Sequence, residues 1–225
     1  MTPTQLVKPR QPTSDGHHAA HVDLYWLPLG AGGRFVRMNG RIYETLSAWF
    51  HRRPRRDLYH SALEVHLPEG RYTIESAPIR PADGPDRGVV GEGAVGSRLL
   101  GRLRIFRYEL RCWREGHIPD VAEAVESPRR LTTDPERARA LLAVVPDAPT
   151  PVWGRDGLRA GEWWNSNSFI AWLIVRSGLD ADAIKPPAGG RAPGWDAGVT
   201  IARRQESGHR TRATSRQAFS RTATG

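Results

Sequence analysis

The 225 residues contain 39% hydrophobic and 25% charged side chains, a balance typical of globular proteins, which excludes a wholly disordered or fibrous chain. The length suits one domain with a sizeable core. The net charge of +9 invites a nucleic-acid function, but residues 203–225 alone carry six arginines against one glutamate. No recognition motif accompanies them, so we do not expect nucleic acid as a partner.

The first 51 residues predict a flexible arm, a strand and a helix. Residues 1–20 are polar and lack periodicity, which indicates a flexible arm. Residues 21–29 are rich in β-forming side chains and end at a Gly-rich turn, so they predict a strand. Residues 41–51 place apolar side chains at helical spacing and predict a helix that packs on a sheet.

The next two segments predict a β-hairpin. Residues 57–67 alternate, with His60, Glu64 and His66 on one face, and a Pro-Glu-Gly turn leads into a second strand at 71–77. Adjacent strands of a hairpin bring their side chains close together.

Residues 78–96 are dense in Gly and Pro and predict a long loop. A third strand is predicted at 103–113, where charged and apolar residues alternate and Cys112 points to the core.

Helical signals dominate the second half. Residues 134–145 begin with Asp134 as the N-cap and Pro135 at the first helical position. Residues 166–178 form a markedly apolar segment that ends at a glycine, which predicts a central helix. A last strand is expected at 197–202.

These elements predict an α+β fold in which an antiparallel sheet packs against a central apolar helix. The chain divides into a flexible arm at 1–20, a single domain at 21–202 and a disordered Arg-rich tail at 203–225. The lone cysteine excludes an internal disulfide, and we find neither a signal peptide nor a membrane span, so the cytoplasm is the expected location. No cofactor and no metal site are expected, and the pattern leaves the oligomeric state open.

Two short motifs suggest chemistry. The run Tyr59-His60-Ser61-Ala62-Leu63-Glu64-Val65 is followed, about a hundred residues later, by Asn165-Ser166-Asn167-Ser168-Phe169. Together they resemble the circularly permuted papain-like group, which includes the lecithin:retinol acyltransferases, the PPPDE peptidases and permuted NlpC-type amidases. In that group a strand histidine precedes a helix that begins Asn-Cys-x-x-Phe, and the cysteine is the nucleophile.

The resemblance implies a role for each matching residue. His60 would be the base, and Ser166 would occupy the nucleophile position, flanked by Asn165 and Phe169. This chain departs from the family pattern because it has serine where the family has cysteine. Glu75, on the strand paired with that of His60, is our choice for the group that orients the base.

General chemical principles also allow acyl transfer at Ser166, independently of the family resemblance. A serine at a helix N-terminus lies near backbone N–H groups that can hold an oxyanion, but it needs a base to remove its proton. His60 can be that base, and Glu75 would fix its tautomer as in a Ser-His-acid triad. Glu64 or His66, on the same strand face as His60, could replace Glu75.

Each of these residues also has a structural interpretation. Asn165 and Ser166 could simply cap the helix, and His60 could be a hydrogen-bonded histidine within the sheet. Glu75 could pair with an arginine. Asn165, Asn167, Trp163 and Trp164 are candidate binding residues, although the two tryptophans are more typical of a core or a cleft wall.

Two function classes follow. The first is a hydrolase or acyltransferase that cleaves an amide, thioester or ester bond of an unknown small-molecule or peptide substrate. The second is an inactive papain-like domain that binds a peptide, a lipid or a protein.

Overall fold

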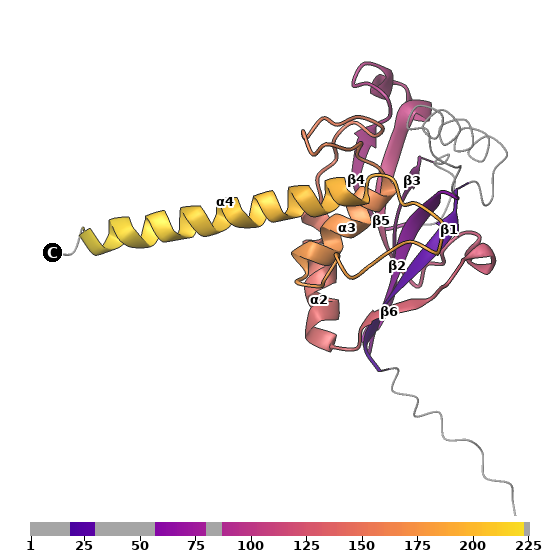
Figure 1. Cartoon of the computed structure of the whole chain (residues 1–225), viewed down its shortest axis with the longest axis horizontal. Coiled ribbons are helices and arrows are strands. Elements are labelled where there is room, and N and C mark those ends of the chain that lie inside the picture. The colour runs from indigo at the N-terminus through magenta and orange to yellow at the C-terminus, as the bar shows by residue number, and fades with distance from the viewer. Residues whose placement is uncertain (1–18, 30–56, 80–86, 223–225) are drawn as a thin grey trace, which may run out of the picture.

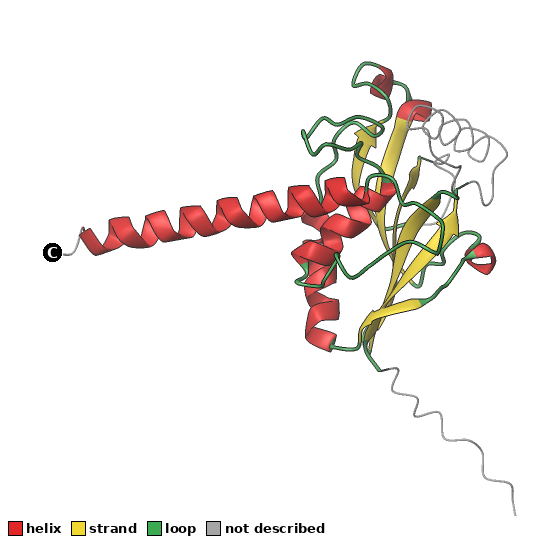
Figure 2. Ribbon diagram, in the orientation of Figure 1, coloured by secondary structure: helices red, strands yellow, loops and turns green. Residues whose placement is uncertain are grey.

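The computed structural model describes residues 19–29, 57–79 and 87–222 (Figures 1 and 2). In this part of the chain, six strands form one antiparallel sheet in the order β4-β5-β3-β2-β1-β6, so the predicted α+β class with an antiparallel sheet is confirmed. The strands are β1 (His21–Pro28), β2 (Tyr59–Leu67), β3 (Gly70–Pro78), β4 (Val89–Ala94), β5 (Arg107–Arg114) and β6 (Arg129–Thr132).

Three α-helices accompany the sheet in the described ranges: α2 (Pro135–Val144), α3 (Ser166–Arg176) and α4 (Trp195–Thr222). None of these helices combines the length and the hydrophobicity that crossing a membrane requires. The predicted helix at 41–51 and most of the predicted N-terminal arm lie outside the described residues.

Helix α3 is the centre of the core, as its apolar sequence predicts. Every residue of α3 except Arg176 is buried. Its side chains pack against one face of the sheet, where Leu24, Leu63 and Ile74 are fully buried in the same cluster. Burial on all sides explains why this helix is hydrophobic around its whole circumference.

The predicted hairpin of β2 and β3 is confirmed, but the two strands pair over only part of their length. Pairing runs from Leu63 opposite Ile74 to Leu67 opposite Gly70. Beyond Ile74, β3 continues paired with β5, whereas the start of β2 is paired with β1. The sheet therefore parts between β2 and β3 at the end where β2 begins.

Helix α2 confirms its predicted start. The Asp134 carboxylate accepts a hydrogen bond from the backbone N–H of Glu136 over 2.8 Å, and Pro135 occupies the first turn. This is the arrangement that satisfies the unpaired amide groups at a helix N-terminus.

Two predictions around the third strand are corrected. Residues 89–94, assigned to a loop, form the edge strand β4. The predicted strand at 103–113 begins only at Arg107, because residues 100–106 form the short helices η1 (Leu100–Arg102) and η2 (Arg104–Phe106). Glycine is depleted in strands and therefore does not predict one. Gly93 is nevertheless needed in β4, because a Cβ there would lie 2.4 Å from the Tyr108 ring.

The prediction of a last strand is also corrected. Residues 197–202 belong to helix α4 instead of a strand, and the helix continues to Thr222 through most of the segment predicted to be a disordered tail. Its first turns pack on α3, and beyond them α4 extends away from the rest of the molecule (Figure 1). Gly198 permits this packing, because a Cβ there would lie 2.1 Å from the carbonyl oxygen of Ser168.

Candidate functional site

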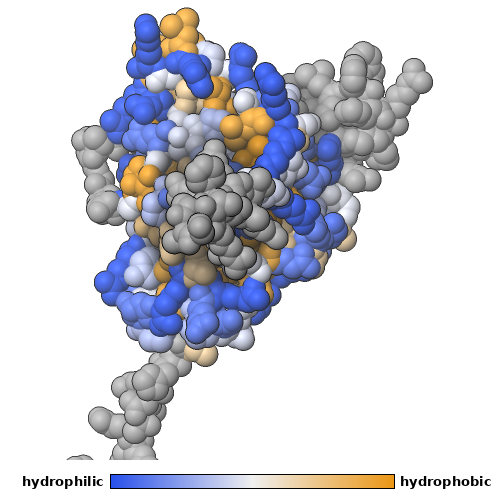
Figure 3. Space-filling model, turned by 90° about the vertical axis from the view of Figure 1, so that its left-hand side faces the viewer, coloured by the Kyte–Doolittle hydropathy of each residue, from blue (hydrophilic) through white to orange (hydrophobic). Residues whose placement is uncertain are grey.

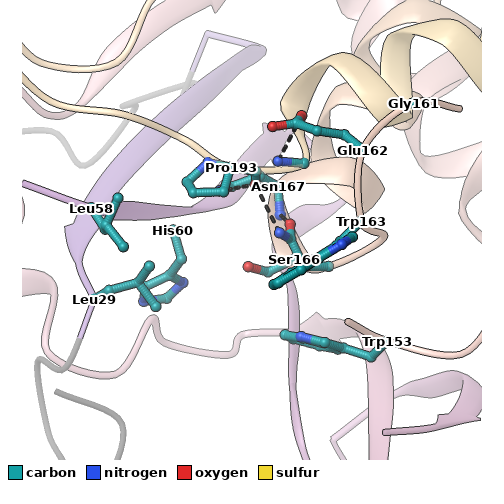
Figure 4. Close-up of a pocket in the computed structure, with 12 residues that line it drawn as sticks. Leu29, Leu58, His60, Trp153, Gly161, Glu162, Trp163, Ser166, Asn167 and Pro193 are labelled. Atoms are coloured by element: carbon teal, nitrogen blue, oxygen red, sulfur yellow. Dashed lines mark hydrogen bonds between the residues drawn. The ribbon is translucent and has the colours of Figure 1, made fainter. Parts of the chain in front are cut away.

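A pocket of about 330 Å³ lies where α3 begins and β2 and β3 part. His60, Leu58 and Leu29 line one side, and Ser166, Trp163 and Trp153 line the other (Figure 4). The remaining lining residues are Asn165, Asn167, Gly161, Glu162, Pro193 and Gly194. The size is at the lower end of the range typical of small-molecule sites.

The pocket brings together the two residues predicted to act as base and nucleophile. His60 belongs to β2 and Ser166 to the first turn of α3. Within the described ranges, however, no hydrogen bond joins them, and β2 explains why. Ser61 points to the α3 side of the sheet, where it contacts Asn167, so the neighbouring His60 leaves the strand on the opposite face.

Ser166 is 6% exposed at the start of α3. Its hydroxyl has no hydrogen-bond partner among residues 19–29, 57–79 and 87–222, and the capping role belongs to Asn165 instead. The Asn165 side-chain oxygen accepts from the backbone N–H groups of Asn167 and Ser168, and the Ser168 hydroxyl closes a reciprocal capping box. The Ser166 hydroxyl thus lies at the helix N-terminus and takes no part in the capping hydrogen bonds.

Asn167 joins the helix to the strand. Its side-chain amide donates to the carbonyl oxygens of Tyr59 and Pro193 over 3.0 and 2.9 Å, while its oxygen accepts from the Ser61 hydroxyl. The Asn165 amide likewise donates to Pro193 over 2.8 Å. Both asparagines predicted to bind a ligand are therefore occupied in shaping the pocket wall.

The electrostatics keep His60 uncharged. Burial lowers the pKa of His60 from 6.5 to about 4, and the charge of Asp120 opposes this shift. The imidazole is thus neutral at neutral pH and has lone-pair capacity to accept a proton. Sequence reasoning missed Asp120, which precedes a short helix with no motif to mark it.

Glu75 contacts Arg111 instead of His60. Its carboxylate accepts from the Arg111 guanidinium over 2.6 Å, and the same guanidinium donates to Glu109 over 2.5 Å. All three side chains are buried. Within the described residues, no hydrogen bond between Glu75 and His60 supports the predicted orienting role. The alternative interpretation, in which Glu75 pairs with an arginine, agrees with the contact to Arg111.

The alternative orienting groups also have other contacts. Glu64 accepts from the Tyr25 hydroxyl over 3.1 Å and from Arg71 over 3.3 Å. His66 lies 3.4 Å from Glu64 and stacks on the His21 ring. This cluster forms a separate polar group on the sheet.

The two predicted binding tryptophans have different environments. Trp163 is 50% exposed and lines the pocket, whereas Trp164 is buried in the core and is not part of the pocket. Trp153 supplies a second aromatic wall and packs edge-on against the Tyr108 ring. No sequence motif marks Trp153 for this role.

Glu162 is a further pocket residue, for which the sequence predicts no individual role. Its carboxylate accepts from the backbone N–H of Gly194 over 2.9 Å, at the start of α4 (Figure 4). Burial raises the pKa of Glu162, and the nearby Asp196 adds to the increase. An anion at a helix N-terminus is favoured by the helix dipole, which accounts for its position.

Comparison with known proteins adds no relative: no protein-family model, curated protein or solved structure matches the chain. In the described ranges, no three His, Cys, Asp or Glu side chains are grouped so that they could hold a metal ion. The resemblance to the permuted papain-like group and the cytoplasmic location both stay predictions.

Proposed function

We propose that this protein is a hydrolase or acyltransferase that acts on an amide, thioester or ester bond through Ser166 and His60. One observation carries the proposal: a serine at a helix N-terminus and an uncharged histidine, 106 residues apart in the chain, line the same pocket. This order, a strand histidine followed by a helix-borne nucleophile, is that of the permuted papain-like group.

The proposed mechanism uses groups already at the pocket. The neutral His60 accepts the Ser166 proton as the oxygen attacks the substrate carbonyl. Backbone N–H groups at the start of α3 stabilise the oxyanion that forms. His60 then returns the proton to the leaving group, and water or another acceptor releases the acyl group from Ser166.

His60 becomes positively charged during this step, so it needs a negative partner. Asp120 is the acid whose charge acts on His60, and we assign it the stabilising role first given to Glu75. Substrate binding has to draw the imidazole and the hydroxyl together, since they are not hydrogen-bonded in the free pocket.

The second candidate function is a pocket that binds a peptide, lipid or protein without chemistry. It is favoured by the Glu75–Arg111 contact, since no acid in the described part of the chain is hydrogen-bonded to His60, and by the low pKa of His60, which makes it a weak base. The walls formed by Trp153, Trp163 and Leu58 suit an apolar or aromatic group.

Fluorophosphonate labelling of the purified chain separates the two functions. We expect labelling that Ser166→Ala abolishes and His60→Ala strongly reduces. Ser207→Ala and His117→Ala are matched controls, because both residues are exposed and neither lines the pocket. An unlabelled chain, or labelling that survives Ser166→Ala, would favour the binding function.

A further inference from the structure

The loop formed by residues 96–106 connects β4 to β5 and protrudes at one end of the molecule (Figure 1). It holds four exposed aliphatic side chains within seven residues. Ile105 is 81% exposed and Leu99 is 69% exposed, and Leu103 and Leu100 follow at 57% and 43%. Large apolar side chains gathered in this way mark an interaction surface.

Arginines alternate with these apolar residues. Arg98, Arg102 and Arg104 are exposed, and residues 96–106 contain no acidic side chain. At the base of the loop, Glu92 is paired with Arg107 over 2.8 Å. Figure 3 shows apolar and charged side chains next to each other at this tip of the molecule.

Hydrogen bonds hold the loop in this shape. The backbone N–H of Leu100 donates to the Ser97 hydroxyl over 3.1 Å, and Leu103 and Phe106 close two further short turns. At the base, the N–H of Gly96 donates to the carbonyl oxygen of Trp153 over 2.9 Å. The aliphatic side chains are thus held outward by a braced backbone.

We propose that the 96–106 loop docks on the surface of a bilayer that contains anionic lipids. Leu99, Leu103 and Ile105 enter the boundary between head groups and acyl chains, while Arg98 and Arg102 contact lipid phosphates. Mixed aliphatic and cationic side chains on one protruding element fit this interface, because each kind meets its preferred environment at a different depth. The proposal is independent of the Ser166 chemistry.

The test is co-sedimentation of the full chain with vesicles. Binding is expected to vesicles of phosphatidylcholine with about one third phosphatidylserine, and to weaken in pure phosphatidylcholine. Leu103→Ser/Ile105→Ser should weaken binding at least about tenfold, since both side chains would lose their apolar burial. Arg98→Gln/Arg102→Gln should weaken it about fivefold for each arginine removed.

Matched substitutions elsewhere identify the surface. Val121→Ser removes an exposed aliphatic side chain outside the loop, and Arg203→Gln/Arg204→Gln removes two charges from α4. Both variants should bind like the parent chain. Absence of vesicle binding, equal losses in the loop and control variants, or loop variants that alter only self-association of the chain would overturn the proposal.

Discussion

The Ser61 hydroxyl donates a hydrogen bond to the side-chain oxygen of Asn167 over 2.9 Å, between residues that are 106 positions apart. Both side chains are buried. Since the same asparagine also donates to Tyr59 and Pro193, it fixes the start of α3 against β2 and against the loop before α4. Asn167 thus ties together three segments that surround the pocket.

Asn167→Ala should therefore lower the free energy of unfolding by about 3 kcal/mol, because the buried Ser61 hydroxyl loses its acceptor and the Tyr59 carbonyl loses its side-chain donor. Ser61→Ala should cost about 1 kcal/mol. In urea unfolding, the double variant should lose about 1 kcal/mol less than the sum of the single losses, since the shared bond is removed once. Strict additivity would show that the two side chains do not interact.

Replacing each of the two glycines of α4 with alanine should change the free energy of unfolding in opposite directions. Gly198→Ala should lower the free energy of unfolding by about 2 kcal/mol, because its Cβ meets the Ser168 carbonyl. Gly208→Ala has open space and should raise it by up to about 1 kcal/mol, as expected for alanine inside a helix. No gain in stability or in helical circular dichroism for Gly208→Ala would favour the disordered tail predicted from sequence.

Helix α4 shows where local pattern misleads. Val199, Thr200 and Ile201 are β-branched and sit beside a glycine, which is a strand signal. Their helical state depends on packing against α3, a tertiary contact that no local window contains. By contrast, α2 and α3 carry their own start signals at Asp134 and Asn165, and both were predicted correctly.

Replacing Arg111 should cause a large loss of stability. Arg111→Met leaves the buried Glu75 carboxylate without its cation, while Glu109 keeps only Arg87 at 3.2 Å, so the free energy of unfolding should fall by about 3–5 kcal/mol. Arg107→Met, which removes an arginine from the exposed pair with Glu92, should cost at most about 1 kcal/mol. Equal losses in urea unfolding would contradict the burial of this cluster.

The same cluster marks the limit of sequence reasoning about the site. Alternation on β5 predicts a charged face, and such a face is usually solvated, yet here Glu109 and Arg111 are buried. Glu75 was assigned to His60 because their strands are neighbours, but the two strands part before that point. The two motifs were enough to predict that His60 and Ser166 line one pocket. Which acid can reach His60 depends on how β2 and β3 pair, and the sequence does not show that pairing.

The lowered pKa of His60 predicts a pH dependence. An ordinary histidine in the unfolded chain gains its proton near pH 6.5, whereas folded His60 stays neutral down to about pH 4. Its contribution to stability is complete above pH 6.5 and is lost as the pH falls toward 4, by on the order of 3 kcal/mol. The stability difference between the parent chain and His60→Gln, measured by urea unfolding across this pH range, should shrink accordingly.

Ser166→Cys tests the electrostatics of the nucleophile position directly. Burial raises the pKa of Cys112, the natural cysteine, to about 11, so the parent chain should react negligibly with iodoacetamide at neutral pH. The N-terminus of α3 favours a thiolate, so the new thiol should react about tenfold faster than the exposed thiol of Ser207→Cys at pH 6. A rate equal to or below that of Ser207→Cys would mean that burial outweighs the helix dipole, and the proposed activation of Ser166 would lose its electrostatic basis.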